Sequence, residues 1–560
     1  MSAMPSKDEQ DNEHEKATDL EAGGSDIQTP TASDGDSTQD TNTEGTEHVL
    51  SGLKLATVVA ALMLTILCVA LDNTIIATAT PKITDTFGTI DDISWYGTAY
   101  FLFTCAFQLV YSKFYIFFDV KWVFLSALSL FEVGSIICAV SNTSNTFIAG
   151  RAVAGLGAAG LFSGATAIVV LVAPLATRPV INGMIGAMFG VCSILGPLIG
   201  GILAEKSTWR WCFWINLPLG AIAAAGIIFF VKLKGRLRPL EGTPFQKVRQ
   251  FDPPGNLIFV GAVLSLLFAL HWGGDAFAYS SPRIIALFTL FGFFTIAFIV
   301  VEVFQSDEHT IVPARVIKCR SVAFGAIFAL CVGGTIFLIV YHLSLWFQVV
   351  RGASPIMSAV KSLPTILGQL FATIFAGILT KKLGHYIPFV WASAILMPIG
   401  CGLFTTFKYD MSTAKWAAYL VILGLGLGFG FQQPQVACQA ALPTADIPTG
   451  SALVFSCQFL GGTIFLAVAQ HRFSSTLRRE AMELQIPGLS ADKVVNMGAT
   501  QLRAIIPPDA LQDFLVRYNE AIVGAFTVAL IVSCVSVIGA VGMEWLSVKE
   551  EVPASEKSDG

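Results

Sequence analysis

The feature that most constrains this chain is a series of apolar segments, each about 20 residues long, which is the length that one α-helix needs to cross a bilayer. Fourteen such segments follow one another between residues 54 and 543. Only 13% of the 560 residues are charged and 54% are hydrophobic, which is far too little charge for a soluble enzyme of this length. The sequence therefore predicts an all-α integral membrane protein.

The number of spans and the charges of the short loops together predict the orientation of the chain in the membrane. The predicted spans are 54–77, 95–115, 121–140, 146–172, 181–203, 213–232, 255–273, 283–304, 321–342, 355–379, 387–407, 415–437, 449–471 and 519–543. Because their number is even, both termini lie on one side. The short loops on that side are richer in lysine and arginine, as in the stretch from Lys232 to Arg249, so the positive-inside rule predicts cytosolic termini.

The segments outside the spans differ sharply from them in composition. Residues 1–48 are rich in Asp, Glu, Ser, Thr and Gly, which predicts a disordered acidic cytosolic tail with no removable signal peptide before it. The loop at about 473–518 is long and has helix signals of its own, so we expect a small extracellular helical cap there. Asn142 begins an N-x-[ST] sequon in a short outer loop and is a candidate glycosylation site.

Two charged residues fall at similar depth in different spans. Asp72 lies 18 residues beyond Lys54, or roughly 27 Å at helical rise, and Arg151 enters span four from the outer side. A charge within hydrocarbon is expensive, so such residues face a partner or a watery cavity. Our hypothesis is a pair that is made and broken as Asp72 releases and takes up a proton. The alternative is a permanent structural ion pair.

A second carboxyl group falls near mid-membrane. Glu132, in SLFEVGSIIC, is about 11 residues into span three and is another candidate proton site. The alternative is a packing role, in which its carboxyl group bonds to a neighbouring hydroxyl group.

Span five carries closely spaced small residues in GAMFGVCSILGPLIGG. Their spacing lets another helix approach closely, and Pro197 removes a backbone donor and bends the helix. Such a surface is suited to the rocking of helices against one another.

Uncharged amides with aromatic neighbours mark a candidate substrate cavity, because such a lining accepts varied apolar molecules that carry a few polar groups. The alternative for each amide is hydrogen bonding between helices. The cavity candidates are Gln108, Gln369, Gln432, Gln433, Phe455 and Gln458.

Several chemistries lack their sequence signatures. The chain contains no G-x-x-x-x-G-K-[ST] phosphate loop, which excludes ATP hydrolysis by this chain, and no H-E-x-x-H or G-x-S-x-G motif. We expect no cofactor, no metal and no nucleic acid partner. The sequence instead favours transport that is powered by an ion gradient.

Four stretches resemble the fourteen-span drug:proton antiporters of the major facilitator superfamily, of the type found in fungi. These stretches are LDNTIIATATP, RAVAGLGAAG, GPLIGG and WRWCFWINLPLG. Later stretches, GFGFQQPQVACQAAL, QFLGGTIFLAVAQHRF and NMGATQLRAI, are similar to those of fungal efflux pumps for mycotoxins and other secondary metabolites. Ala154, Cys192 and the loop YSKFYIFFDVKW depart from the family pattern.

The resemblance implies a domain organisation. We expect a six-helix bundle at 49–232, a basic cytosolic loop at 233–254, two inserted spans at 255–304, a second six-helix bundle at 305–543 and a cytosolic tail at 544–560. It also implies coupling through Asp72 and Arg151 and an antiporter motif at Gly196, Pro197, Gly200 and Gly201.

We therefore expect a monomeric exporter that exchanges protons for small, largely apolar organic molecules by alternating access, surrounded by membrane lipid. The plasma membrane is the expected location, and a vacuolar or vesicle membrane is the alternative. Two other functions stay open, namely a proton-coupled importer, for example of siderophores, and a membrane sensor that transports nothing.

Overall fold

The computed structural model describes residues 52–89, 92–231, 243, 249–274, 277–305, 310–484 and 506–549. The predicted acidic tail and most of the predicted basic loop lie outside these residues. Within the described part of the chain, fourteen helices are long and apolar enough to cross a membrane. This confirms the predicted number of spans and the all-α membrane fold.

The first half of the chain forms one group of helices. They are α1 (Gly52–Phe87), α2 (Ile93–Phe117), α3 (Val120–Val140), α4 (Ser144–Val172), η1 (Leu175–Thr177), α5 (Arg178–Lys206), α6 (Trp211–Trp214) and α7 (Asn216–Phe230). Residues of α1 to α5 and α7 share a buried hydrophobic cluster that includes Phe124, Phe131 and Ile168.

The second half forms another group. Its helices are α11 (Ala314–Lys318), α12 (Arg320–Leu345), the π-helical turn η2 (Trp346–Val350), α13 (Pro355–Lys361), α14 (Leu363–Leu383), α15 (Ile387–Phe404), α16 (Thr413–Phe431), α17 (Gln433–Ala441), α18 (Ile447–Leu484) and α21 (Pro508–Gly542). A separate buried cluster around Trp346, Phe404 and Phe526 lies within this half. The exact bounds of the two predicted bundles stay a prediction.

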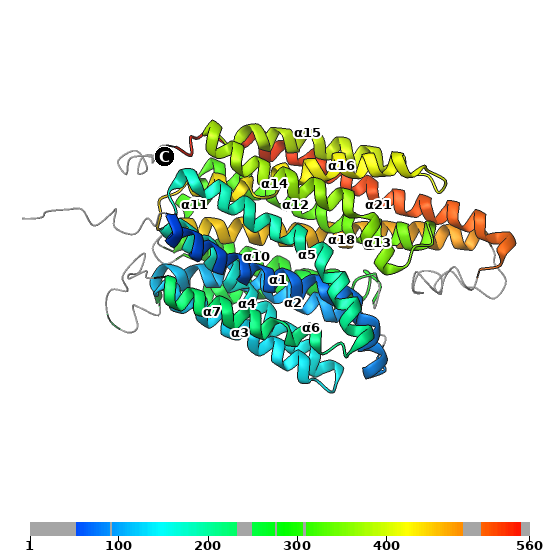
Figure 1. Cartoon of the computed structure of the whole chain (residues 1–560), viewed down its shortest axis with the longest axis horizontal. Helices are drawn as coiled ribbons and strands as arrows, with labels where there is room; N and C mark the ends of the chain where they lie inside the picture. Colours follow the sequence, from blue (N-terminus) through cyan, green and yellow to red (C-terminus); the bar gives the residue numbers. More distant parts are fainter. Residues whose placement is uncertain are drawn as a thin grey trace, which may run out of the picture. The chain divides into compact units, whose positions relative to one another are not determined.

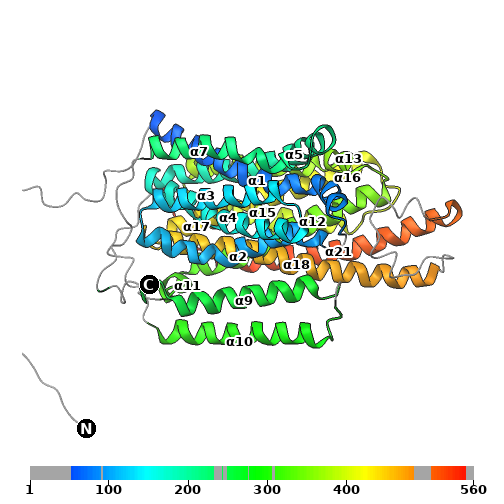
Figure 2. The same cartoon turned by 90° about the horizontal axis from the view of Figure 1, so that it is seen from below.

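Two helices connect the halves along the sequence and lie at the edge of the molecule. These are α9 (Pro253–Trp272) and α10 (Pro282–Phe304), which run side by side in Figure 2. In α10 only Ile284 is buried, and Phe293 and Ile296 are more than half exposed. A helix that is apolar all round and barely covered by protein is suited to contact with lipid.

Two predicted spans are broken by proline. The expected helix 355–379 divides at Ser362 into α13 and α14, and 415–437 divides at Gln432 into α16 and α17. Pro364 and Pro434 each lie in the first turn of the helix that follows, where a proline needs no backbone donor. Gln432, between α16 and α17, and Gln439, within α17, make contacts that are described below.

The last two spans are longer than predicted. With 38 and 35 residues, α18 and α21 reach roughly 50 to 57 Å at helical rise, well beyond a hydrocarbon core of about 30 Å. They extend past their neighbours in Figure 1, at the right. Arg517 of α21 joins them through bonds to Glu480 (2.7 Å) and Glu483 (2.9 Å). Residues 485–505, the middle of the expected cap, are outside the described residues.

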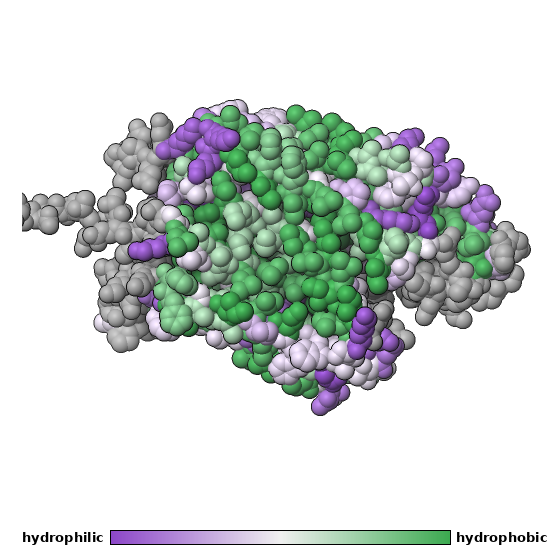
Figure 3. All heavy atoms as spheres, viewed as in Figure 1, coloured by the Kyte–Doolittle hydropathy of each residue, from purple (hydrophilic) through white to green (hydrophobic). Residues whose placement is uncertain are grey.

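The start of α1 and the end of α21 lie at one end of the bundle, at the left of Figure 1. We call this end the terminal side and the opposite end the far side. Figure 3 shows apolar residues over the middle of one face and hydrophilic residues towards both ends. This distribution is the one that a bilayer selects, because water meets the protein only at the two ends.

Candidate functional site

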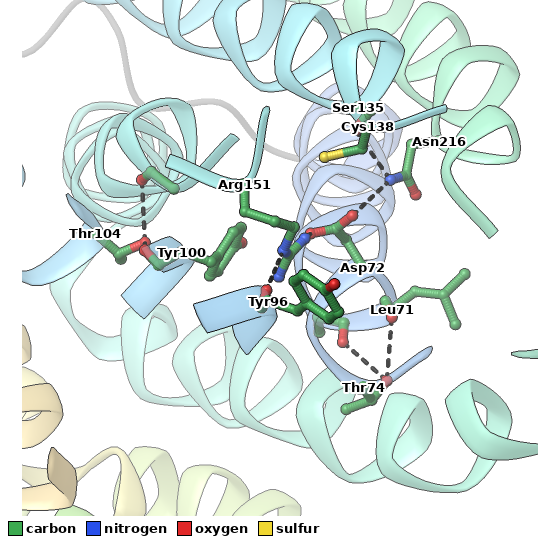
Figure 4. Close-up of polar contacts among 12 residues, drawn as sticks. Leu71, Asp72, Thr74, Tyr96, Tyr100, Thr104, Ser135, Cys138, Arg151 and Asn216 are labelled. Carbon is green, nitrogen blue, oxygen red and sulfur yellow. Dashed lines mark hydrogen bonds and ion pairs between the residues drawn. The ribbon is translucent and has the colours of Figure 1, made fainter. Parts of the chain in front are cut away.

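The two charged residues that the sequence placed at similar depth are in direct contact. Nη1 of Arg151, on α4, lies 2.5 Å from Oδ2 of Asp72, on α1, and neither side chain is exposed to solvent (Figure 4). Breaking such a buried pair by removing one partner typically costs about 3 to 5 kcal/mol, because the remaining charge is left uncompensated. The pair therefore joins α1 and α4 strongly for as long as Asp72 is ionised.

Arg151 is held by α2 as well. Its Nε donates to the backbone oxygen of Tyr96 at 2.9 Å, and the guanidinium group lies 4.5 Å from the centre of the Tyr100 ring (Figure 4). A ring face attracts a cation most when both are shielded from water. Nη2 has no hydrogen-bond partner among the described residues. Arg151 thus has alternative stabilising contacts if Asp72 loses its charge.

The second oxygen of Asp72 has a partner that the sequence did not predict. Asn216, at the start of α7, donates from Nδ2 to Oδ1 of Asp72 at 3.1 Å and lies 3.2 Å from the hydroxyl oxygen of Ser135 on α3. All three side chains are fully buried. Asn216 occurs in the WRWCFWINLPLG stretch, and its polar amide just inside an apolar span is a signal that could have identified it.

Glu132 lies on the same interface between α3 and α7. It is one helical turn from Ser135, and a Cβ atom at Gly220, one turn from Asn216, would overlap its carboxylate. Both carboxylate oxygens are buried and lack hydrogen-bond partners in the described part of the chain. Glu132 is therefore close to the Asp72 network without a direct bond to it.

The predicted antiporter motif packs against the helix that carries Asp72. Gly196 of α5 contacts Thr74 and Gly200 contacts Thr78 and Ile75, so the two backbones approach closely. Thr74 also donates its hydroxyl hydrogen to the backbone oxygen of Cys192 at 2.9 Å. Gly201 is less crowded, because the nearest atom to an added Cβ atom there, in Ile356, would be 3.7 Å away. Pro197 lies inside α5.

The predicted cavity residues differ in their contacts, and their common role in a cavity stays a prediction. Gln108 donates to Ser163 at 3.0 Å within the first half, and Gln369 is half-buried on α14. Gln432 packs against Gly186 of α5, across the two halves. The amide oxygen of Gln433 and the amide nitrogen of Gln458 are buried without partners among the described residues.

Phenylalanine rings from both halves meet between them. The ring of Phe162 lies 5.7 Å from Phe189 in a stacked arrangement, 5.9 Å from Phe455 and 5.6 Å from Phe459. Phe189 in turn lies 6.1 Å from Phe431. We call these five residues the phenylalanine belt. Phe455 is a cavity candidate from the sequence, whereas Phe162 and Phe189 of the first half were not predicted.

A groove of about 650 Å³ lies elsewhere, between the terminal-side parts of α1 and α5. Its lining is almost wholly apolar and includes Val59, Met63, Met184 and Met188. None of the predicted cavity residues lines this groove.

The predicted sequon is accessible. Asn142 is exposed in the turn before α4, where its side-chain oxygen lies 3.4 Å from Nη2 of Arg210. Glycosylation at Asn142 stays a prediction. No group of three or more metal-binding side chains occurs within the described ranges.

Comparison with known proteins agrees with this architecture. The family model described as Major Facilitator Superfamily matches residues 62–466. "Efflux pump aflT" of Aspergillus parasiticus is 45% identical over 507 residues, covering 90% of this chain and 98% of the relative. "Rubrofusarin-specific efflux pump aurT" of Gibberella zeae is 41% identical, covering 89% of this chain and 91% of the relative.

Solved structures share the fold at low identity. The human organic anion transporter MFSD10 has a TM-score of 0.55 at 14% identity, with 86% of this chain and 100% of that chain covered. The proton:xylose symporter XylE has a TM-score of 0.52 at 13% identity, with 87% and 94% covered. This chain therefore belongs to the Major Facilitator Superfamily and is a multi-pass membrane transporter rather than an enzyme.

Proposed function

We propose that this transporter exports small, largely apolar organic molecules, such as fungal secondary metabolites, in exchange for protons. The single observation that carries the proposal is the buried pair of Asp72 and Arg151. An ion pair sealed from water and shared by two helices is a contact whose strength a single proton can change.

The proton step involves only residues of this network. A proton that arrives from outside binds a carboxylate oxygen of Asp72, and the neutral carboxyl group no longer attracts Arg151 as an ion. The guanidinium group keeps the backbone oxygen of Tyr96 and the ring of Tyr100. The free-energy difference between the two conformations then changes by the free energy of the interaction that was lost. Release of the proton into the cytosol restores the pair, so a proton gradient drives the cycle in one direction.

Glu132 is proposed as a second proton site. Its buried oxygens have no partner in the described residues, and a neutral carboxyl group is much less expensive in such a place than an ionised one. Its position one turn from Ser135 puts it beside the interface that holds Asp72. Protons on the two carboxyl groups would then affect one another.

The antiporter motif supplies the movable contact. Gly196 and Gly200 allow α5 to lie directly on α1, and Pro197 interrupts the hydrogen bonds of α5. Close contacts between small residues can slide without the repacking of large side chains. Movement of α1 on protonation of Asp72 would thereby reach α5.

The phenylalanine belt is proposed as the apolar part of the substrate site. Its rings come from both halves and contact one another, so a flat apolar molecule can replace ring contacts with contacts of its own. The amide oxygen of Gln433 and the amide nitrogen of Gln458, which lack partners among the described residues, would bind a polar substituent. Gln108, Gln369 and Gln432 would contribute further amides.

The direction of transport rests on the relatives, several of which are named as efflux pumps. We propose that the terminal side is cytosolic, that the transporter works as a monomer and that it acts in the plasma membrane.

The test uses purified full-length protein in liposomes, with rubrofusarin as the probe because one relative is named for it. An acidic compartment on the far side of the transporter should drive the probe into that compartment, and a protonophore should abolish the accumulation. Accumulation on the terminal side would instead support an importer. An absence of probe movement and of probe-induced proton flux in both directions would contradict the proposal.

A further inference from the structure

Two buried amides connect the halves on the terminal side, and the proposed function does not use them. Nδ2 of Asn182, near the start of α5, donates to Oε1 of Gln439, near the end of α17, at 3.0 Å. Each residue is only 3% exposed. This is a direct hydrogen bond between side chains that are 257 positions apart in the sequence.

The backbones beside this bond are almost in contact. A Cβ atom added at Gly183, next to Asn182, would lie 2.9 Å from the backbone oxygen of Thr373 on α14. One added at Gly377 would lie 2.6 Å from the backbone oxygen of Pro179 on α5. Real Cβ atoms do not tolerate such distances, so only glycine allows the approach. The terminal-side ends of α5 and α14 are therefore closed upon each other in this conformation.

Gln439 and Gln432 both contact α5. They are seven residues apart, which is two helical turns. Their partners on α5 are Gly186 for Gln432 and Asn182 for Gln439, so residue numbers fall along α5 as they rise along α17. The two helices therefore run antiparallel along a short polar contact.

We infer that the hydrogen bond between Asn182 and Gln439 is a lock that stabilises the conformation closed on the terminal side. The inference rests on the proposed function in one respect, namely that alternating access must separate α5 from α14 and α17 at this end. The lock breaks in that movement, and both amides then face the opened path.

The chemistry of the lock suits a contact that must open repeatedly. Both partners are neutral, so water in an opened path replaces the bond without the large desolvation term of an ion pair. Nε2 of Gln439 has no partner among the described residues, and water would satisfy it in the open state. The lock therefore favours closure without making it irreversible. Interhelical hydrogen bonds of this kind change an equilibrium about three- to tenfold.

Hydrogen exchange of the full-length protein in lipid nanodiscs measures this equilibrium, because exchange of closed segments follows the population of the open state. Asn182→Leu and Gln439→Met should each speed exchange about three- to tenfold in peptides covering 173–190 and 370–385. The double variant should add little to either single variant.

A matched control is available on the same helix. Nε2 of Gln435 donates to the backbone oxygen of Ser451 at 3.1 Å, entirely within the second half. Gln435→Met should leave exchange at 173–190 unchanged. Unchanged exchange in Asn182→Leu, or equal acceleration in Gln435→Met, would overturn the inference.

Two further measurements separate opening from general damage. In a misfolded variant, exchange would also rise in the parts of α18 and α21 that project on the far side. The exchanged pair Asn182→Gln with Gln439→Asn restores a donor and an acceptor and should return exchange towards the wild-type rate. Its failure to do so in a folded protein would count against the lock. The experiment needs no substrate and no proton gradient, so a failure of proton coupling would leave its outcome unaffected.

Discussion

Asn216 and Arg151 hold opposite oxygens of the same carboxylate, with Asn216 Nδ2 3.1 Å from Oδ1 of Asp72 and Arg151 Nη1 2.5 Å from Oδ2. Both contacts favour the ionised form of Asp72, but only one of them carries a charge. Arg151 supplies the strength of the pair, and Asn216 orients the carboxylate.

Asn216→Leu should alter the coupling of export to protons, because the carboxylate of Asp72 loses a hydrogen-bond donor. A hydrogen bond to a charged group contributes about 1.5 to 3 kcal/mol, so the dependence of probe export on external pH should change. The measurement is the dependence of export on external pH in liposomes. A variant with lower maximal export but the same pH profile would show a purely structural role.

Arg151→Met should destabilise the protein by about 3 to 5 kcal/mol, because it leaves the carboxylate of Asp72 buried and unpaired. Combination with Asp72→Asn removes that charge and should recover most of the lost thermal stability. Thermal unfolding of the two single variants and the double variant gives the coupling directly. If the losses of stability in the two single variants simply add in the double variant, the pair makes no energetic contribution to the fold.

Gly200→Ala should block transport, since the added Cβ atom would lie 2.8 Å from the backbone oxygen of Ile75. Gly201→Ala is the matched control, because an added Cβ atom there would be 3.7 Å from its nearest neighbour. The two variants are compared by measuring export of the probe at equal amounts of inserted protein. Equal loss in both variants would show that the contact with α1 is not what matters.

Phe162→Ala should weaken apparent affinity for a flat aromatic probe about three- to tenfold, because aromatic contacts contribute about 0.5 to 1.5 kcal/mol beyond simple burial. Phe293→Ala removes a ring that is 63% exposed on α10 and serves as the control. The KM for export is the readout. A KM that is the same in both variants would remove the phenylalanine belt from the substrate site.

The sequence predicted the spans well because hydropathy and length alone determine whether a segment can cross a bilayer. It also placed Asp72 and Arg151 at one depth, since helical rise converts residue number into distance. However, the depth of a residue in the membrane does not tell in which direction its side chain points around the helix axis. The contact with Asn216 depends on how α7 is turned towards α1, and no periodic pattern in an almost uniformly apolar helix reveals that.

The same limit explains the cavity candidates. Residue type distinguished amides from apolar residues, but it could not separate Gln108, which bonds within one half, from Gln432, which contacts the other half. The division of this span at Gln432 and the hydrogen bond between Asn182 and Gln439 were likewise not predicted, because hydropathy reports neither a break in a helix nor its rotation. The length of α18 was also underestimated, because its polar continuation past residue 471 no longer looks like a membrane span.

Transport by Asp72→Asn in liposomes with an imposed pH gradient tests proton coupling through Asp72 directly. The substitution keeps the size of the side chain and removes the group that takes up the proton. We predict normal insertion, movement of the probe only down its own gradient, and no response to pH. Uphill, pH-driven export by the Asp72→Asn protein would contradict the central claim that this carboxyl group couples protons to transport.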